Sequence, residues 1–157
     1  MLPPRSPAAS PLTAISLKGR ALRLLSGREH SRAELEKRLQ QYEEAPGDLV
    51  KALDELEGKG FISEQRVIES VINRRQAKLG AARIRQELQS KGLDKEAVID
   101  AIASLQATEL ERARDLWNRK FGEVALDTKE RGKQIRFFAS RGFSGDVIRK
   151  VMAGSVE

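Results

Sequence analysis

The chain contains no cysteine and a single histidine, and these absences narrow its possible chemistry. Without cysteine, neither disulfide bonds nor thiolate metal sites can form. The lone histidine, His30, precedes the helix cap Ser31, a boundary position where such a residue packs or caps, so we expect neither a Ser–His–acid triad nor a histidine-based zinc site. No glycine-rich phosphate-binding loop occurs either. The sequence therefore predicts a protein that is not an enzyme and binds no metal or cofactor.

Long apolar segments are also missing. No stretch approaches the roughly 20 apolar residues that cross a bilayer. The first 16 residues hold four prolines in place of the continuous apolar run of a signal peptide. We therefore expect residues 1–16 to be a disordered N-terminal tail, and the protein to be cytoplasmic, with no membrane partner.

The apolar residues that are present recur at helical spacing. Hydrophobic residues make up 39% of the chain and aromatic residues only 4%, a mixture that favours helices over strands. Capping boxes begin at Ser31 and Thr108, and Gly60, Gly92 and Gly142 are typical helix stops. We expect an all-α fold of three tandem three-helix, helix-turn-helix-like repeats in an elongated array, with repeats at residues 17–62, 63–107 and 108–157.

Aromatic residues gather in the last of these repeats. Trp117 lies four residues before Phe121, so we expect a core position for it, although a base could also stack on it. Ile135 and Phe138 are expected to face inward. Phe137, next to Phe138 on the same helix, should point sideways, and we favour packing against the neighbouring repeat over contact with a partner.

The segment Gly80–Asp94 reads as a short basic helix, a glycine stop and the capped start of another helix. A variant of this unit returns 50 residues later, where Arg141-Gly142-Phe143-Ser144 stands for Lys91-Gly92-Leu93-Asp94. Chains that repeat a small helical unit usually present an extended surface to a partner.

Charge is the clearest indication of what that surface binds. The net charge is +6, yet residues 17–62 carry 9 basic and 9 acidic side chains, so the excess lies in the C-terminal two-thirds. A basic surface favours nucleic acid or an acidic partner, whereas the alternative is a solvated face neutralised in part by Glu87, Glu123 and Glu130. The candidate binding residues form one cluster across the Gly80 turn and a counterpart in the third repeat: Arg74, Arg75, Lys78, Arg83 and Arg85, then Arg119, Lys120, Lys129, Arg131, Lys133 and Arg136.

Several motifs resemble the RecX family of bacterial RecA regulators. The strongest is Lys78–Leu93, with its glycine, its Ala-Arg-Ile-Arg-Gln-Glu-Leu run and its Lys-Gly-Leu turn. The segments Arg23–Leu39 and Gly58–Ile62 resemble the first repeat, and Arg119–Gly122 with Phe137–Phe143 resembles the third. The segment Ser63–Val67 departs from the family pattern, in which an acidic cap and an aromatic residue are common.

The resemblance implies a cytoplasmic, monomeric, all-helical protein that lodges in the groove of the RecA filament on single-stranded DNA. Such a protein would suppress RecA ATP hydrolysis and strand exchange and temper recombination, DNA repair and the SOS response. Weak direct DNA binding would fit the basic surface.

Two other functions remain open on the residues alone. One is a helix-turn-helix DNA-binding transcriptional regulator, because Lys91–Asp94 has the length and glycine of such a turn. Against it, the helices that follow this turn and the Gly142 turn offer few base-reading side chains. The other is a scaffold that binds an acidic protein without DNA.

Overall fold

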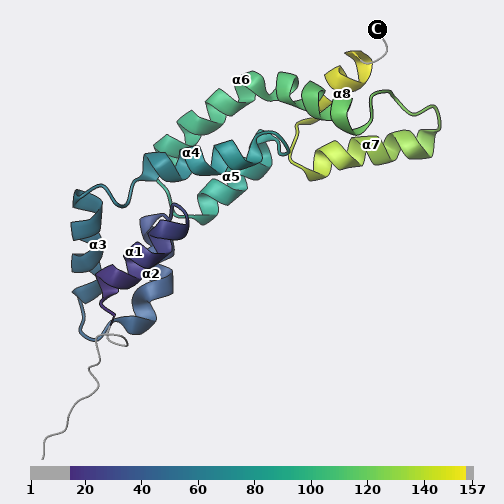
Figure 1. The fold of residues 1–157 in the computed structure, drawn as a ribbon. Helices are drawn as coiled ribbons and strands as arrows, with labels where there is room; N and C mark the ends of the chain where they lie inside the picture. Colours follow the sequence, from purple (N-terminus) through teal and green to yellow (C-terminus); the bar gives the residue numbers. More distant parts are fainter. Residues whose placement is uncertain (1–14, 155–157) are drawn as a thin grey trace, which may run out of the picture. The chain divides into compact units, whose positions relative to one another are not determined.

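The structure, a computed structural model, describes residues 15–154, in which all regular secondary structure is helical (Figure 1). Within these residues there is no β-strand, which confirms the all-α prediction. The predicted tail lies outside the described residues except for Ile15 and Ser16. The helices are α1 (Leu17–Gly27), α2 (Arg32–Leu39), the short 3-10 helix η2 (Gln40–Tyr42), α3 (Asp48–Gly58), α4 (Glu64–Arg75), α5 (Ala81–Ser90), α6 (Lys95–Lys120), α7 (Thr128–Ser140) and α8 (Gly145–Gly154).

The chain divides into two compact units, the first ending at Val67 and the second beginning at Ile68. In the first unit, α1, α2 and α3 enclose one hydrophobic cluster. The predicted capping box opens α2: Ser31 Oγ accepts a hydrogen bond from Glu34 N at 3.1 Å, and Glu34 Oε1 accepts one from Ser31 N at 2.9 Å. The cluster consists of Ala21, Leu35, Leu39, Leu49, Leu53, Leu56 and Ile62.

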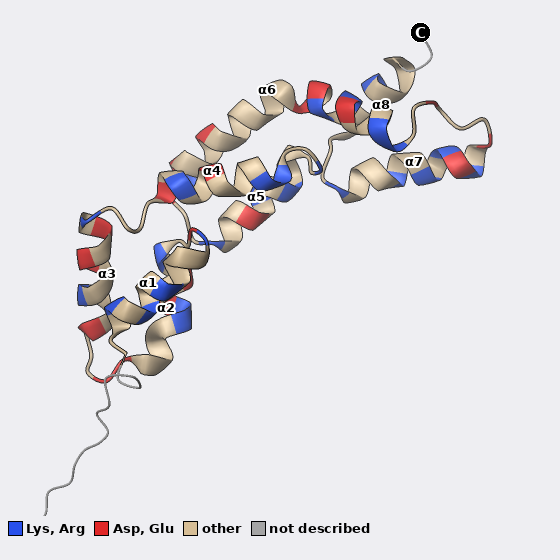
Figure 2. Cartoon of the chain, viewed as in Figure 1, with Lys and Arg blue, Asp and Glu red and all other residues tan. Residues whose placement is uncertain are grey.

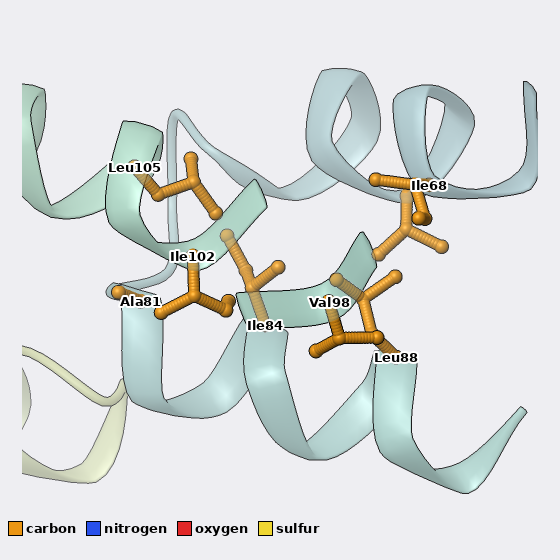
Figure 3. Close-up of a cluster of buried hydrophobic side chains, with 8 residues drawn as sticks. Ile68, Ala81, Ile84, Leu88, Val98, Ile102 and Leu105 are labelled. Atoms are coloured by element: carbon orange, nitrogen blue, oxygen red, sulfur yellow. The ribbon is translucent and has the colours of Figure 1, made fainter. Parts of the chain in front are cut away.

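The second unit contains a cluster formed by α4, α5 and the first half of α6. Figure 3 shows side chains of α5 directed between the other two helices, with Ile84 and Leu88 facing Ile68 and Val98. Ile84 and Leu88 are fully buried, as the helical spacing predicts. The cluster comprises Ile68, Val71, Ala81, Ile84, Leu88, Val98, Ile102 and Leu105.

Helix α6 corrects one prediction. A capping box was expected to start a new helix at Thr108, but α6 runs unbroken from Lys95 to Lys120. No glycine or proline interrupts this stretch, and the Thr108 hydroxyl donates to Leu105 O at 3.2 Å, a contact that a threonine inside a helix can make. The boundary predicted at residue 107 therefore falls inside one helix. We propose that it marks the point along α6 at which the packing partners change.

The second half of α6 packs with α7 and α8 around aromatic residues. Trp117 is 2% exposed, which confirms the core prediction. Phe137 instead packs edge-on against Phe121, at 5.4 Å between ring centroids, inside its own repeat, so packing on a neighbouring repeat is wrong. Ile135 is also placed differently from the prediction, since it is 41% exposed.

The residue that turns inward beside Ile135 is Gln134. Its amide accepts a hydrogen bond from Ala125 N at 3.0 Å and donates one to Glu123 O at 3.1 Å. The loop between α6 and α7 therefore takes its backbone partners from a buried amide, which an apolar side chain could not supply.

Candidate partner-binding surface

Four of the five basic residues predicted around Gly80 do come together. Arg74 and Arg75 end α4, Lys78 lies in the connection, and Arg83 lies on α5. They line a surface hollow of about 550 Å³ together with Leu79, Gln86 and Glu87. We call this the α4–α5 hollow.

The fifth residue, Arg85, lies elsewhere. It lines a separate hollow with Ala81, Gln106 and Phe143, so the prediction of one face is wrong for Arg85. Residues two apart on a helix point about 200° apart, which takes Arg85 away from Arg83.

The α4–α5 hollow is strongly positive because four cations face a single carboxylate. Arg75 Nε lies 3.0 Å from Glu87 Oε1, so the neutralisation by Glu87 that was the alternative to a binding face does occur, but it covers only one cation. Arg74 Nε donates to Ser70 O at 3.3 Å, and Lys78 makes no ion pair with any residue the structure describes. A net charge of +3 in one hollow suits phosphate or carboxylate oxygens.

Arg83 also has a structural role. Its Nη1 donates to Ser140 O at 2.7 Å, at the end of α7. Beside it, Gly80 N donates to Arg141 O at 2.8 Å and Ala82 N donates to Gly142 O at 3.3 Å. The start of α5 is thus hydrogen-bonded to the turn between α7 and α8, and Arg83 is part of this junction.

Two glycines make the junction possible. A Cβ atom on Gly80 would lie 2.4 Å from Gly142 O, and one on Gly142 would lie 2.6 Å from Arg83 N. Gly142 also has a φ of 89°, in the left-handed region that side chains disfavour. Only glycine at both positions allows the two backbones to approach so closely.

A buried carboxylate completes the junction, and the sequence reasoning missed it. Glu109 on α6 is 4% exposed. Its Oε1 accepts from Ala81 N at 2.7 Å and its Oε2 accepts from Ser144 N at 3.1 Å, so one side chain caps the N-termini of both α5 and α8. The sequence feature that could have identified Glu109 is its place in the apolar stripe of α6, four residues after Leu105 and four before Ala113.

Arg112, one turn further along α6, holds the other side of this junction. Its Nη1 donates to Gln76 O at 2.9 Å and to Leu79 O at 3.0 Å, beyond the end of α4. Burial lowers the pKa of Arg112, while the nearby Glu109 carboxylate raises it. Arg119 Nη2 extends the contact by donating to Ala77 O at 3.0 Å. Arg112 and Arg119 thus bind backbone carbonyls just beyond the end of α4.

The remaining basic residues predicted in the third repeat are spread over different contacts. Arg131 donates from Nε to Ala125 O at 3.1 Å and from Nη2 to Leu126 O at 3.0 Å, so it holds the α6–α7 loop. Lys133 pairs with Glu130 at 3.1 Å, which fits the alternative that Glu130 neutralises part of the cluster. Lys120 lies 5.2 Å from the centre of the Phe137 ring. Lys129 and Arg136 are exposed on α7.

Other site types receive no support from the described residues. Residues 15–154 contain no group of three or more His, Cys, Asp or Glu side chains placed to hold a metal ion. No helix in that part of the chain is long and apolar enough to span a bilayer.

Comparison with known families accounts for most of the chain. Three family models match in order along it: the first three-helix domain of RecX at residues 18–56, the second at 63–102 and the third at 107–152. The chain belongs to the RecX family. Its fold class is therefore the three-helix repeat fold expected from the sequence.

Relatives of known name agree with this assignment. The regulatory protein RecX of Leptothrix cholodnii is 50% identical over 92% of this chain and 92% of its own length. That of Herminiimonas arsenicoxydans is 46% identical over 91% and 95% of the two chains. A regulatory role follows for this RecX family member.

Solved structures support the fold independently of close sequence similarity. The crystal structure of RecX from Lactobacillus salivarius covers 89% of this chain and 94% of its own, with a TM-score of 0.71 at 21% identity. A second crystal structure of regulatory protein RecX aligns with a TM-score of 0.67 at 20% identity, covering 86% of this chain and 70% of that one.

Proposed function

We propose that this RecX family member binds the RecA filament on single-stranded DNA and lowers RecA ATP hydrolysis and strand exchange. The observation that carries the proposal is the match of all three RecX domains in order along the chain. The protein acts as a cytoplasmic monomer, hydrolyses no nucleotide itself and tempers recombination and the SOS response. Family membership favours this function over a helix-turn-helix transcriptional regulator.

The α4–α5 hollow is the surface we assign to the filament. Its net charge of +3 attracts the phosphates of filament DNA or carboxylates of RecA, and guanidinium groups bind both with paired hydrogen bonds. Arg74 and Lys78 are the best single candidates, because both are exposed and neither holds the junction with α7. The exposed residues Lys120, Lys129, Lys133 and Arg136 remain secondary candidates in the third repeat.

The test is RecA ATPase on single-stranded DNA with and without the protein. The parent chain should inhibit hydrolysis. An Arg74→Gln/Lys78→Gln variant should need a several-fold higher concentration, and the salt dependence of its binding should fall by roughly 0.7 units of slope for each lost contact to a single-strand phosphate. Arg83 is left unchanged, because its substitution would also disturb the α7 junction.

A charge-matched control distinguishes a specific role of the α4–α5 hollow from a general effect of removing positive charge. Arg85→Gln/Lys95→Gln removes two exposed cations of the same unit outside the α4–α5 hollow and should inhibit like the parent. A parent that leaves RecA activity unchanged would refute the proposed function. A hollow variant that inhibits like the parent would refute only the surface. Tight binding to one duplex sequence at high salt would support the transcriptional regulator instead.

A further inference from the structure

The first repeat is neutral by residue count, but its charges are divided between its helices. Figure 2 shows lysines and arginines prominent on α1 and α2, whereas α3 displays mostly acidic residues. The acidic side chains of α3 are Asp48, Asp54, Glu55 and Glu57. A net charge of zero therefore conceals a basic face made by α1 and α2.

A hollow of about 310 Å³ opens on this basic face. Arg20 and Arg23 of α1 and Arg38 of α2 line it, and no carboxylate does. The other lining residues are Leu24, Leu39, Gln41 and Tyr42. We call this the α1–α2 hollow.

The three arginines are left without acidic partners. Other arginines of the first unit are neutralised: Arg28 pairs with Glu34 at 2.8 Å, and Arg32 pairs with Glu57 at 2.8 Å. Among residues 15–154, by contrast, none of the three arginines of the hollow makes an ion pair. Their charge is available to an external anion, and it faces no internal carboxylate that the anion would have to displace.

An aromatic ring stands at the edge of the hollow. Tyr42 in η2 is 42% exposed, and the Arg20 guanidinium lies 3.7 Å from the centre of its ring. This stacking holds the guanidinium in place while leaving its edge N–H groups free to donate. The stacked pair also offers a flat surface of the kind on which unpaired bases stack.

We infer that the α1–α2 hollow binds single-stranded nucleic acid. Phosphates of the strand bind Arg20, Arg23 and Arg38, and an unpaired base packs against the stacked Arg20 and Tyr42. A run of carboxylates would satisfy the arginines but would gain nothing from the aromatic pair, and paired bases of a duplex cannot reach it. The site lies in the first compact unit. It goes beyond the proposed action on RecA, because it binds nucleic acid in the absence of RecA.

The experiment measures binding of a fluorescently labelled oligothymidylate to the full chain without RecA. Arg23→Gln/Arg38→Gln should weaken binding about tenfold and lower the salt slope by roughly 1.4, since each lost single-strand phosphate contact contributes about 0.7. Tyr42→Ala should weaken binding several-fold, whereas Tyr42→Phe should bind like the parent. Circular dichroism on each variant checks that helicity is kept. If Tyr42→Ala unfolds, the test still rests on Tyr42→Phe and on the double arginine variant.

Controls decide between this site and general electrostatics. Lys37→Gln/Lys59→Gln removes the same charge from exposed positions of the first unit outside the hollow and should bind like the parent. Equal weakening by this control would overturn the site. Displacement by polyglutamate as effective as by unlabelled oligothymidylate, or equal affinity for duplex, would overturn the assignment to single strands. RecA ATPase is measured separately, so failure here leaves the proposed function standing.

Discussion

The double cap made by Glu109 gives the sharpest test of how the second unit is held together. Glu109→Gln keeps the size of the side chain and one carbonyl acceptor, but its NH2 group then faces one of the two backbone N–H donors, at Ala81 or Ser144. Hydrogen bonds to charged groups contribute about 1.5–3 kcal/mol each. We therefore expect the free energy of unfolding of this unit to fall by about 2–3 kcal/mol. Glu109→Ala leaves both N–H donors without an acceptor and should lower the free energy of unfolding by about 3–5 kcal/mol.

The assay is urea unfolding followed by the fluorescence of Trp117. This is the only tryptophan of the chain, and it is buried in the second unit, so its signal reports that unit. Hydrogen exchange gives a second readout, because the Ala81 and Ser144 amides should lose protection first.

A matched control lies two residues away. Glu111→Gln removes the same charge from an exposed position of α6 and should change stability by no more than about 0.5 kcal/mol. If Glu109→Gln unfolds at the same urea concentration as Glu111→Gln, the carboxylate does not support the two helix starts and the reasoning fails.

Two further predictions concern backbone geometry and pH. Gly142→Ala should destabilise the second unit by about 2 kcal/mol or more in the same urea assay. The new Cβ would lie 2.6 Å from Arg83 N, and the alanine would also have to adopt a positive φ. Gly122→Ala, with a φ of 82° and nothing within 4 Å, should cost only about 1 kcal/mol; equal losses would contradict the close-contact argument. Burial lowers the pKa of His30 in the folded state, so protonation of His30 favours unfolding. The contribution of neutral His30 to the free energy of unfolding is therefore complete above pH 6.5 and is lost as the pH falls below that value. Stability, followed by circular dichroism at 222 nm, should fall as the pH drops below 6.5, by at most about 1.4 kcal/mol per pH unit, and His30→Leu should remove this dependence. An unchanged pH profile in His30→Leu would assign the effect to other groups.

Local patterns predicted most of the fold correctly. The capping box at Ser31 and the buried positions Ile84, Leu88 and Trp117 all follow from residues three or four apart, which share one face of a helix. The same reasoning failed at Thr108, because a capping box is only a local option and nothing there interrupts the helix.

The candidate site was predicted less completely. Sequence proximity identified the basic cluster around Gly80, but helix rotation separates Arg85 from it and the junction with α7 recruits Arg83. The third-repeat cluster did not assemble as one, because Arg119 and Arg131 bind backbone carbonyls. Whether these side chains are free to bind depends on contacts with distant segments.

The sequence by itself determined most of the helices and caps and the absence of cysteine chemistry, because these depend on composition or on short-range spacing. Its local motifs carried the resemblance to the RecX family. The tertiary structure alone decided how Glu109 joins helix starts 28 and 35 residues away, and how Gly80 meets Gly142. It also decided that a repeat of zero net charge carries a basic hollow. A residue count adds charges of opposite sign, whereas folding places them on different faces, and only the faces meet a partner.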